Sequence, residues 1–497
     1  MKKTLISLMT TLFLFFITSP VCLAAGPAEA TQKFNFYMFR NGFAGCTSAQ
    51  IAAFITFAII LLFLIFRKKI VNRLNNSTAS SMLNAFIIFF SVFGIACFTL
   101  AVMTDGETWS ALMHNEAGGR AVVTQFSDYI ITIQDAGSQR FTGSAARFTP
   151  FSLFIYFIIA QFLPPKLVLT ESLFAYNTIL KNQTFMFLYL ILVMMCLLLI
   201  YRMNRSILRR NGRNMRDELV VFLTIVSYPS IYCIELGNIV GFSLALSLFF
   251  ILFHDAKHNV LRELSHIALA ASAAISPLTI LFVCILVKGK TKKSIINIAK
   301  IVVYTLILFF TPCIFTGFEA ISLYISNFFS INPEAYNVAN MSIANLLIFF
   351  GIDNIAVLQI VSIIMNISAL AAIVILPETW QKLSAVVYII LNVFAVSDPM
   401  MLIFVCIPFV FLLAEEKHKA TDWLYLLVFA LLITPFPEWF YFDRAQFNAF
   451  TISIGIRDIR NANNLISLAA VQFMYIVIIC QSIKQLTSKK QKTGSEK

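Results

Sequence analysis

The chain has 497 residues, of which 59% are hydrophobic and only 12% are charged, and its mean hydropathy is +0.84. These proportions leave too little polar surface to cover a soluble globule of this length, so the composition excludes a water-soluble domain and indicates a membrane protein. The net charge of +13 comes from Lys and Arg in short clusters beside apolar runs. Such clusters are typical of cytoplasmic loops rather than of a nucleic-acid-binding surface.

Apolar runs recur from one end of the chain to the other. A helix needs about 20 residues to cross the hydrocarbon layer, and most of these runs are close to that length. The sequence therefore predicts an all-α fold. We expect a polytopic integral membrane protein with about 11 to 13 transmembrane helices, and with re-entrant or interfacial helices on its outer face.

The charge pattern of the first 150 residues predicts their topology. Residues 1–25 contain two lysines, an apolar run and small residues at the end, which is typical of a secretory signal peptide or an N-terminal anchor. The span 49–66 is followed at once by Arg67, Lys68 and Lys69, so it enters the cytoplasm. The span 83–104 then returns outward and places residues 105–149 outside.

The next segment, 150–163, is short and is closed by two prolines. A full crossing there would put the arginine cluster at 202–213 outside, so we expect a re-entrant or interfacial helix. The span 184–201 then carries the arginines inside. Later segments are expected at 219–234, 239–253, 267–275, 278–287, 296–315, 354–376, 383–396, 400–414, 424–435 and 464–481.

These crossings give one membrane domain over residues 26–482 and a basic cytoplasmic tail over 483–497. The pair 267–275 and 278–287 is expected to be a broken hairpin bent at Ser276 and Pro277. Besides 105–149, two longer external intervals are expected at about 317–345 and 436–462. Tight turns at Glu235, Ser276 and Asp398 fall on the same outer face.

Candidate catalytic groups must lie on that face, because the outer turns and loops meet there. The first external loop contains Asp128, and also Asp105, Glu107 and Asp135 as alternatives. No nucleotide-binding motif is present, and a donor already in the membrane would not need one. Sugar transfer from such a donor needs one carboxylate as general base and polar groups for the leaving phosphate. His254 and His258 have a metal-like spacing but lack a third ligand, so no metal and no other cofactor are expected.

Several short motifs resemble, in order, those of the GT-C superfamily of polyprenyl-phosphate-sugar glycosyltransferases. The match is to its bacterial polyprenol-phosphate-mannose-dependent α-mannosyltransferase branch. The motifs are Phe126-Ser-Asp128-Tyr129, Phe148-Thr-Pro150-Phe151, Tyr228-Pro229, Glu235-Leu-Gly237-Asn238, Asn340-Met-Ser342 and Ser397-Asp398-Pro399. The chain departs from the family at Ser276, which follows an Ala-rich run where the family has a lysine.

The resemblance implies that Asp128 is the general base of an inverting transfer. Arg140 or Arg147 is then our candidate for the cation that Ser276 cannot supply. The predicted substrate-binding residues are Tyr129, Arg140, Arg147, Glu235, Asn238, Ser276, Asn340, Ser342 and Asp398.

The sequence thus predicts a hexosyltransferase of the bacterial cytoplasmic (inner) membrane whose active side is periplasmic or extracellular. Its partners would be a polyprenyl-phosphate-linked sugar, a glycan or glycolipid acceptor of the cell envelope and the lipid bilayer, but no nucleic acid. One alternative is an O-antigen polymerase or ligase, which would depend on external arginines such as Arg140, Arg147, Arg444 and Arg457. The other is a transporter or lipid flippase, which the nearly charge-free span interiors disfavour.

Overall fold

The computed structural model describes residues 127–137, 148–164, 182–209, 237–286, 292–316, 318–329, 340–349, 354–393, 399–433 and 463–495, with single positions between 69 and 233 and at 352. Within these ranges the chain is helical and has no strand, which confirms the predicted all-α class. Three helical segments are long and apolar enough to cross a membrane: Ser294–Phe315, Ile355–Ile375 and Ser467–Ser488. The expected leader 1–25, the span 49–66 and the external interval 436–462 lie outside the described residues.

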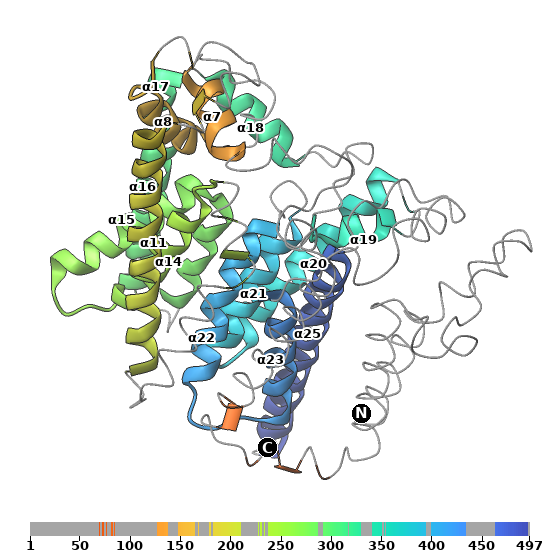
Figure 1. Ribbon diagram of the computed structural model, residues 1–497. Coiled ribbons are helices and arrows are strands. Elements are labelled where there is room, and N and C mark those ends of the chain that lie inside the picture. Colours follow the sequence, from red (N-terminus) through yellow and green to blue (C-terminus); the bar gives the residue numbers. More distant parts are fainter. Residues whose placement is uncertain are drawn as a thin grey trace, which may run out of the picture.

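Three successive helices run back and forth through one half of the molecule (Figure 1). They are α14 (Val240–Phe253), α15 (Asn259–Ile275) and α16 (Lys292–Phe310), and α15 lies between the other two. The shorter helices α7 (Ser127–Gly137), α8 (Pro150–Ala160), α17 (Cys313–Thr316) and α18 (Glu319–Phe329) gather at the top of Figure 1. We call this the α7–α8 end of the molecule.

The predicted break at Ser276 is present. Ser276 has extended backbone angles (φ −131°, ψ 96°), because the ring of the following proline disfavours a helical conformation at the residue before it. Pro277 begins η3 (Pro277–Leu286), a 3₁₀-helix where the sequence predicts the second half of a helical hairpin. The first half is longer than the predicted 267–275, since α15 already begins at Asn259.

Buried hydroxyl groups join α14, α15 and η3. Ser272 Oγ lies 2.7 Å from Ser243 Oγ, 2.8 Å from Ser247 Oγ and 2.9 Å from Thr279 Oγ1. Ser272 Oγ also donates to the carbonyl of Ser243, and Ser243 Oγ donates to the carbonyl of Ser272. Small hydroxyl residues of this kind let helices approach closely in an apolar surrounding and satisfy one another there.

The second half of the molecule contains α20 (Ile355–Ile375), α21 (Thr379–Asn392), η5 (Pro399–Val405), α22 (Cys406–Ala414), α23 (Ala420–Ile433) and α25 (Asn463–Ser495). Its core is aromatic: the rings of Trp380 and Tyr425 meet edge to face at 4.8 Å, and Phe409 and Phe429 at 5.8 Å. Most of the expected basic tail is helical, because α25 continues to Ser495.

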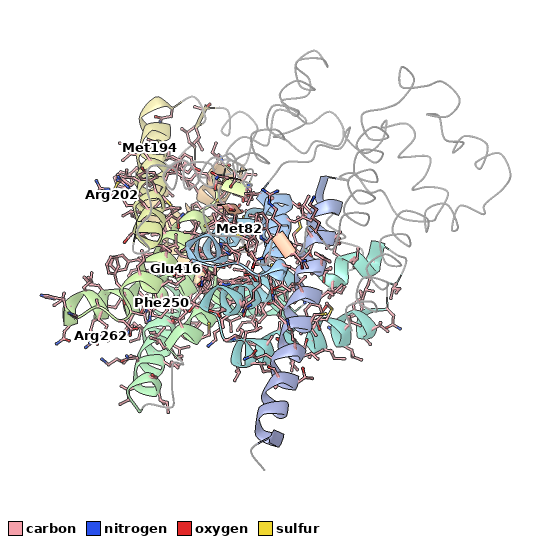
Figure 2. The ribbon with its side chains drawn as sticks, turned by 90° about the horizontal axis from the view of Figure 1, so that it is seen from below. Met82, Met194, Arg202, Phe250, Arg262 and Glu416 are labelled. Carbon is pink, nitrogen blue, oxygen red and sulfur yellow. The ribbon has the colours of Figure 1, made fainter. Side chains whose placement is uncertain are left out.

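Several helices carry apolar side chains on their outward faces. On α11 (Gln183–Arg209) the side chains of Met194 and Met195 are 60% and 57% exposed, and Figure 2 shows Met194 at the edge of the molecule. The same pattern recurs on α16 and on α20, where Ile363, Ile364 and Ile367 are all more than half exposed. Apolar faces of this extent on long helices suit hydrocarbon rather than water.

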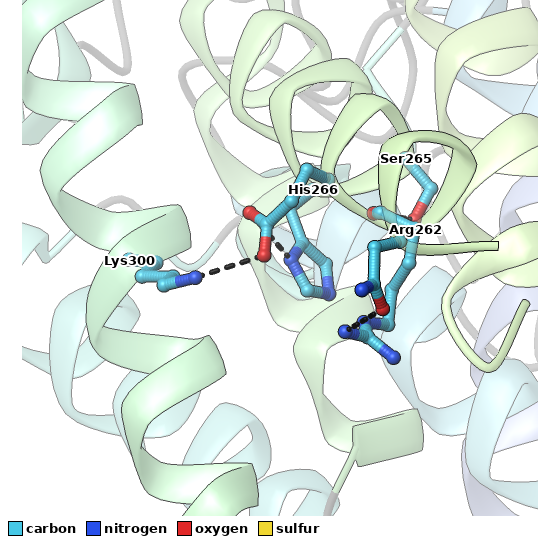
Figure 3. A network of polar contacts seen from close by, with 6 residues as sticks. Arg262, Ser265, His266 and Lys300 are labelled. Carbon is cyan, nitrogen blue, oxygen red and sulfur yellow. Dashed lines mark hydrogen bonds and ion pairs between the residues drawn. The ribbon is translucent and has the colours of Figure 1, made fainter. Parts of the chain in front are cut away.

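A charged network lies in the N-terminal half of α15, away from the break at Ser276 (Figure 3). Lys300 of α16 donates to Glu263 of α15 over 2.8 Å, and the buried His266 approaches the same carboxylate at 3.6 Å. Arg262 donates to Asn259 in the first turn of α15. Among the residues that the structure describes, the Lys300–Glu263 ion pair joins α15 to α16.

Candidate functional site

The predicted base Asp128 stands in the first turn of α7. A carboxylate is favoured at this place, because the unpaired N–H groups of a helix N-terminus carry partial positive charge. The opposite face of α7 is anchored by the buried side chains of Tyr129, Ile130 and Ile133. Gln134 Nε2 also donates to the carbonyl of Leu167 over 3.2 Å. Asp128 is thus partly buried on a helix that is packed firmly into the molecule.

The structure brings Asp128 together with Asn238, which lies 110 residues further along the chain. Asn238 Nδ2 donates to Asp128 Oδ2 over 2.8 Å. The other amide atom, Asn238 Oδ1, accepts from the backbone N–H of Val240 over 3.0 Å, at the first residue of α14. The N-termini of α7 and α14 therefore meet at this carboxylate.

Gly237 allows α7 to lie against this turn. Its φ of +75° is in the left-handed region, which glycine adopts without steric cost. A Cβ at this position would clash with the Cβ of Tyr129, so only glycine fits beside α7. Tyr156 Oη donates to the carbonyl of Gly237 over 3.3 Å, which fixes the turn from the side of α8.

Helix α8 connects this turn to the break at Ser276. Thr149 caps α8 by accepting from the backbone N–H of Ser152, and Pro150 fills the first helical position. Thr149 Oγ1 also donates to the carbonyl of Ala274 at the end of α15. Ser276 follows two residues later and is 5% exposed, so it lies at the same end of the molecule as Asp128.

The aromatic residues of the site serve mainly in packing. Tyr129 is 1% exposed, and its ring centroid lies 4.6 Å from that of Tyr189 on α11. Tyr156 is fully buried and meets Phe148 edge to face at 5.5 Å. Burial and, after it, the charge of Asp128 raise the pKa of Tyr156, so its hydroxyl stays protonated as a donor.

Asn340 and Ser342 have a capping role in the second half of the molecule. Ser342 accepts from the N–H of Asn345 at the start of α19 (Ile343–Phe349), and Asn340 Oδ1 accepts from the N–H of Ser342. The carbonyl of Asn340 accepts from Asn345 Nδ2, and both predicted residues are buried. A contact with substrate stays a prediction for this pair.

Of the predicted site residues, the structure thus gathers four at the α7–α8 end of the molecule: Asp128, Tyr129, Asn238 and Ser276. Four others lie outside the described residues: Arg140, Arg147, Glu235 and Asp398. The sequence analysis did not name Tyr156, and it included Thr149 only within the motif Phe148-Thr-Pro150-Phe151, without a role. The Thr149-Pro150 pair is a helix-start signal that could have marked Thr149.

The two histidines with metal-like spacing do not share a helix. His254 ends α14 and is buried, with Nδ1 3.0 Å from the carbonyl of Ile251, whereas His258 is exposed before the start of α15. In the part of the chain that the structure describes, no three His, Cys, Asp or Glu side chains are grouped so that they could hold a metal ion. No protein-family model matches this chain, and no curated protein or solved structure matches it either.

Proposed function

We propose that this chain is a polytopic glycosyltransferase of the bacterial cytoplasmic membrane. It would move a hexose from a polyprenyl-phosphate donor to an envelope glycan or glycolipid on the outer side. The observation that carries the proposal is the Asp128 carboxylate, held by Asn238 where the N-termini of α7 and α14 meet. The resemblance to the GT-C superfamily, with its Asp in the first external loop, supports the same function.

The chemistry requires one base and no cofactor. Asp128 would accept the proton of the acceptor hydroxyl while that oxygen bonds to the anomeric carbon of the sugar. The bond from this carbon to the phosphate oxygen breaks at the same time, and the polyprenyl phosphate leaves with the electron pair. Attack from the side opposite the phosphate inverts the anomeric configuration.

The placement of charge along α11 supports an outward-facing site. Tyr189 packs on Tyr129 beside Asp128, and Arg202 lies 13 residues further along the same helix. At 1.5 Å per residue this separates them by about 20 Å along the helix axis, and Arg205 and Arg209 lie still further away. If α11 crosses the bilayer, the positive-inside rule puts the arginines in the cytoplasm and Asp128 on the outer side.

The proposal is tested by comparing envelope glycans and glycolipids by mass spectrometry in cells with and without the gene. We expect a species that lacks one hexose in the deletion strain, restored by the wild-type gene and by an Asp255→Asn variant. Asp255 is a suitable control because its side chain is 77% exposed and it lies in the turn after α14, at the far end of that helix from Asn238. Unchanged glycans together with altered uptake of a lipid or solute would instead favour a transporter.

A further inference from the structure

We propose that Asn238 is a positioning residue. Its amide donates a hydrogen bond to Oδ2 of Asp128 and so holds Asp128 in one orientation as an ionised carboxylate. The catalytic role of Asn238 rests on the proposed function, whereas the hydrogen bond between Asn238 and Asp128 does not depend on that function. Asn238 would act through Asp128 and would not need to touch the substrate. Its role would be to fix the orientation and the ionisation of the base.

The orientation of the Asn238 amide follows from its two partners. The backbone N–H of Val240 can only donate, so the atom that receives it must be Oδ1. The NH₂ group is then the one that faces Asp128, and an NH₂ group has no lone pair to accept a proton. Oδ2 of Asp128 is therefore the acceptor, and a donor directed at a carboxyl oxygen favours the ionised form over the protonated one.

The position of the amide is also fixed. The backbone N–H of Asn238 donates to the carbonyl of Cys233 over 3.1 Å, and Cys233 Sγ donates back to the carbonyl of Asn238. Gly237 is bound by Tyr156 and is in contact with Tyr129. Because the turn is restrained on each of these sides, the amide can hold a carboxylate in one orientation without a large entropic cost.

Two substitutions separate this role from the bond that Asn238 makes to the backbone N–H of Val240. Asn238→Asp and Asn238→Ser both keep a side-chain oxygen that can accept from this N–H two residues on, as Asp and Ser commonly do in turns. Neither presents the NH₂ donor to Asp128. Asn238→Asp also places a second carboxylate beside the first, and two carboxylates at this distance do not both ionise readily.

The experiment uses the purified full-length chain in detergent and two readouts. Infrared difference spectroscopy follows the protonation of the Asp128 carboxyl with pH, and the band is assigned by its absence in Asp128→Asn. Steady-state transfer of labelled hexose from polyprenyl phosphate gives kcat and KM at each pH. Asn259→Ser is the matched control, because Asn259 is an exposed amide whose side-chain hydrogen bond among the described residues, from Arg262, lies within the first turn of α15.

We expect the Asp128 carboxyl to titrate at a higher pH in both variants, because both lose the NH₂ donor, and by about one unit or more in Asn238→Asp, which adds a carboxylate. In both variants kcat falls about tenfold or more while KM changes less than about twofold, and the acid limb of the rate profile moves with the infrared titration. Asn259→Ser leaves every value unchanged. Wild-type titration in both Asn238 variants would overturn the inference, whether or not transfer is observed. Absence of transfer by the wild type together with a shifted titration would instead overturn the proposed function alone.

Discussion

Tyr129 and Gly237 lie in direct contact, so that helix α7 rests on the turn that precedes α14. A Cβ at position 237 would come well within 3.0 Å of the Cβ of Tyr129, closer than real carbon atoms approach. The position of Asp128, the neighbour of Tyr129, therefore depends on a glycine at 237.

Gly237→Ala is expected to move α7 and weaken the Asp128–Asn238 contact. The left-handed backbone alone costs about 1–2 kcal/mol for a residue with a Cβ, and the clash adds to this. We expect a lower Tm in detergent and at least a tenfold loss of kcat. The control is Gly241→Ala on α14, where a new Cβ would meet Cys196 Sγ at 3.6 Å in ordinary contact. Equal effects of the two substitutions would show that Gly237 has no special role.

Ser272→Ala should weaken the joint between α14 and α15. It leaves the buried hydroxyls of Ser243, Ser247 and Thr279 with fewer partners, which costs about 1–3 kcal/mol. Ser265→Ala is the control on the same helix, because Ser265 Oγ donates to the carbonyl of Arg262 within α15 and does not join two helices in the part of the chain that the structure describes. Thermal unfolding followed by circular dichroism should show a clearly larger fall in Tm for Ser272→Ala.

Asn392→Ala should destabilise the buried cap of α19. Asn392 Oδ1 accepts from the N–H of Ile343, and its Nδ2 donates to Asn366 Oδ1 over 2.9 Å. Ile343 loses a buried hydrogen bond and Asn366 loses a partly buried one, so we expect a loss of about 2–4 kcal/mol in the free energy of chemical unfolding. Asn354→Ala removes an exposed helix cap and should cost only about 1 kcal/mol. A similar loss of unfolding free energy in both variants would mean that burial of the Asn392 amide adds nothing to stability.

The Glu263–Lys300 pair should make stability depend on pH. The hydrogen bond from Lys300 lowers the pKa of Glu263 below its ordinary value. The contribution of Glu263 is then present at neutral pH and is lost as the pH falls through its folded-state pKa. Glu263→Gln should lower Tm slightly at neutral pH, with a difference from wild type that shrinks towards acid. A difference in Tm that stays constant or grows as the pH falls would contradict this expectation.

The sequence predicts the helices best where apolar runs have clear ends. Helix α20 (Ile355–Ile375) agrees within one residue with the predicted 354–376, because Asn354 caps it and a proline follows Leu376. The predicted start of α21 at 383 is wrong by four residues. The first turn of α21 buries Trp380 against Tyr425. Because the sequence neighbours of Trp380 are polar, this turn is not part of an apolar run and the hydropathy pattern does not predict it.

The site was less predictable than the helices. Helix α7 lies within a polar interval, although Tyr129, Ile130 and Ile133 have the spacing of one buried helical face. No spacing rule connects Asp128 with Asn238 across 110 residues, and their contact depends on the packing of α7, α8 and α14. The family resemblance singled out both residues separately, but it did not predict that they touch.

The most direct test of the central claim is the transfer of labelled hexose from polyprenyl phosphate by purified Asp128→Asn. This variant keeps the size of the side chain and can still accept from Asn238 through its amide oxygen, but it cannot take up the acceptor proton. We expect transfer to fall by about 10²- to 10⁴-fold relative to wild type and to Asp255→Asn, with unchanged membrane insertion and Tm. Transfer by Asp128→Asn at the wild-type rate would contradict the account.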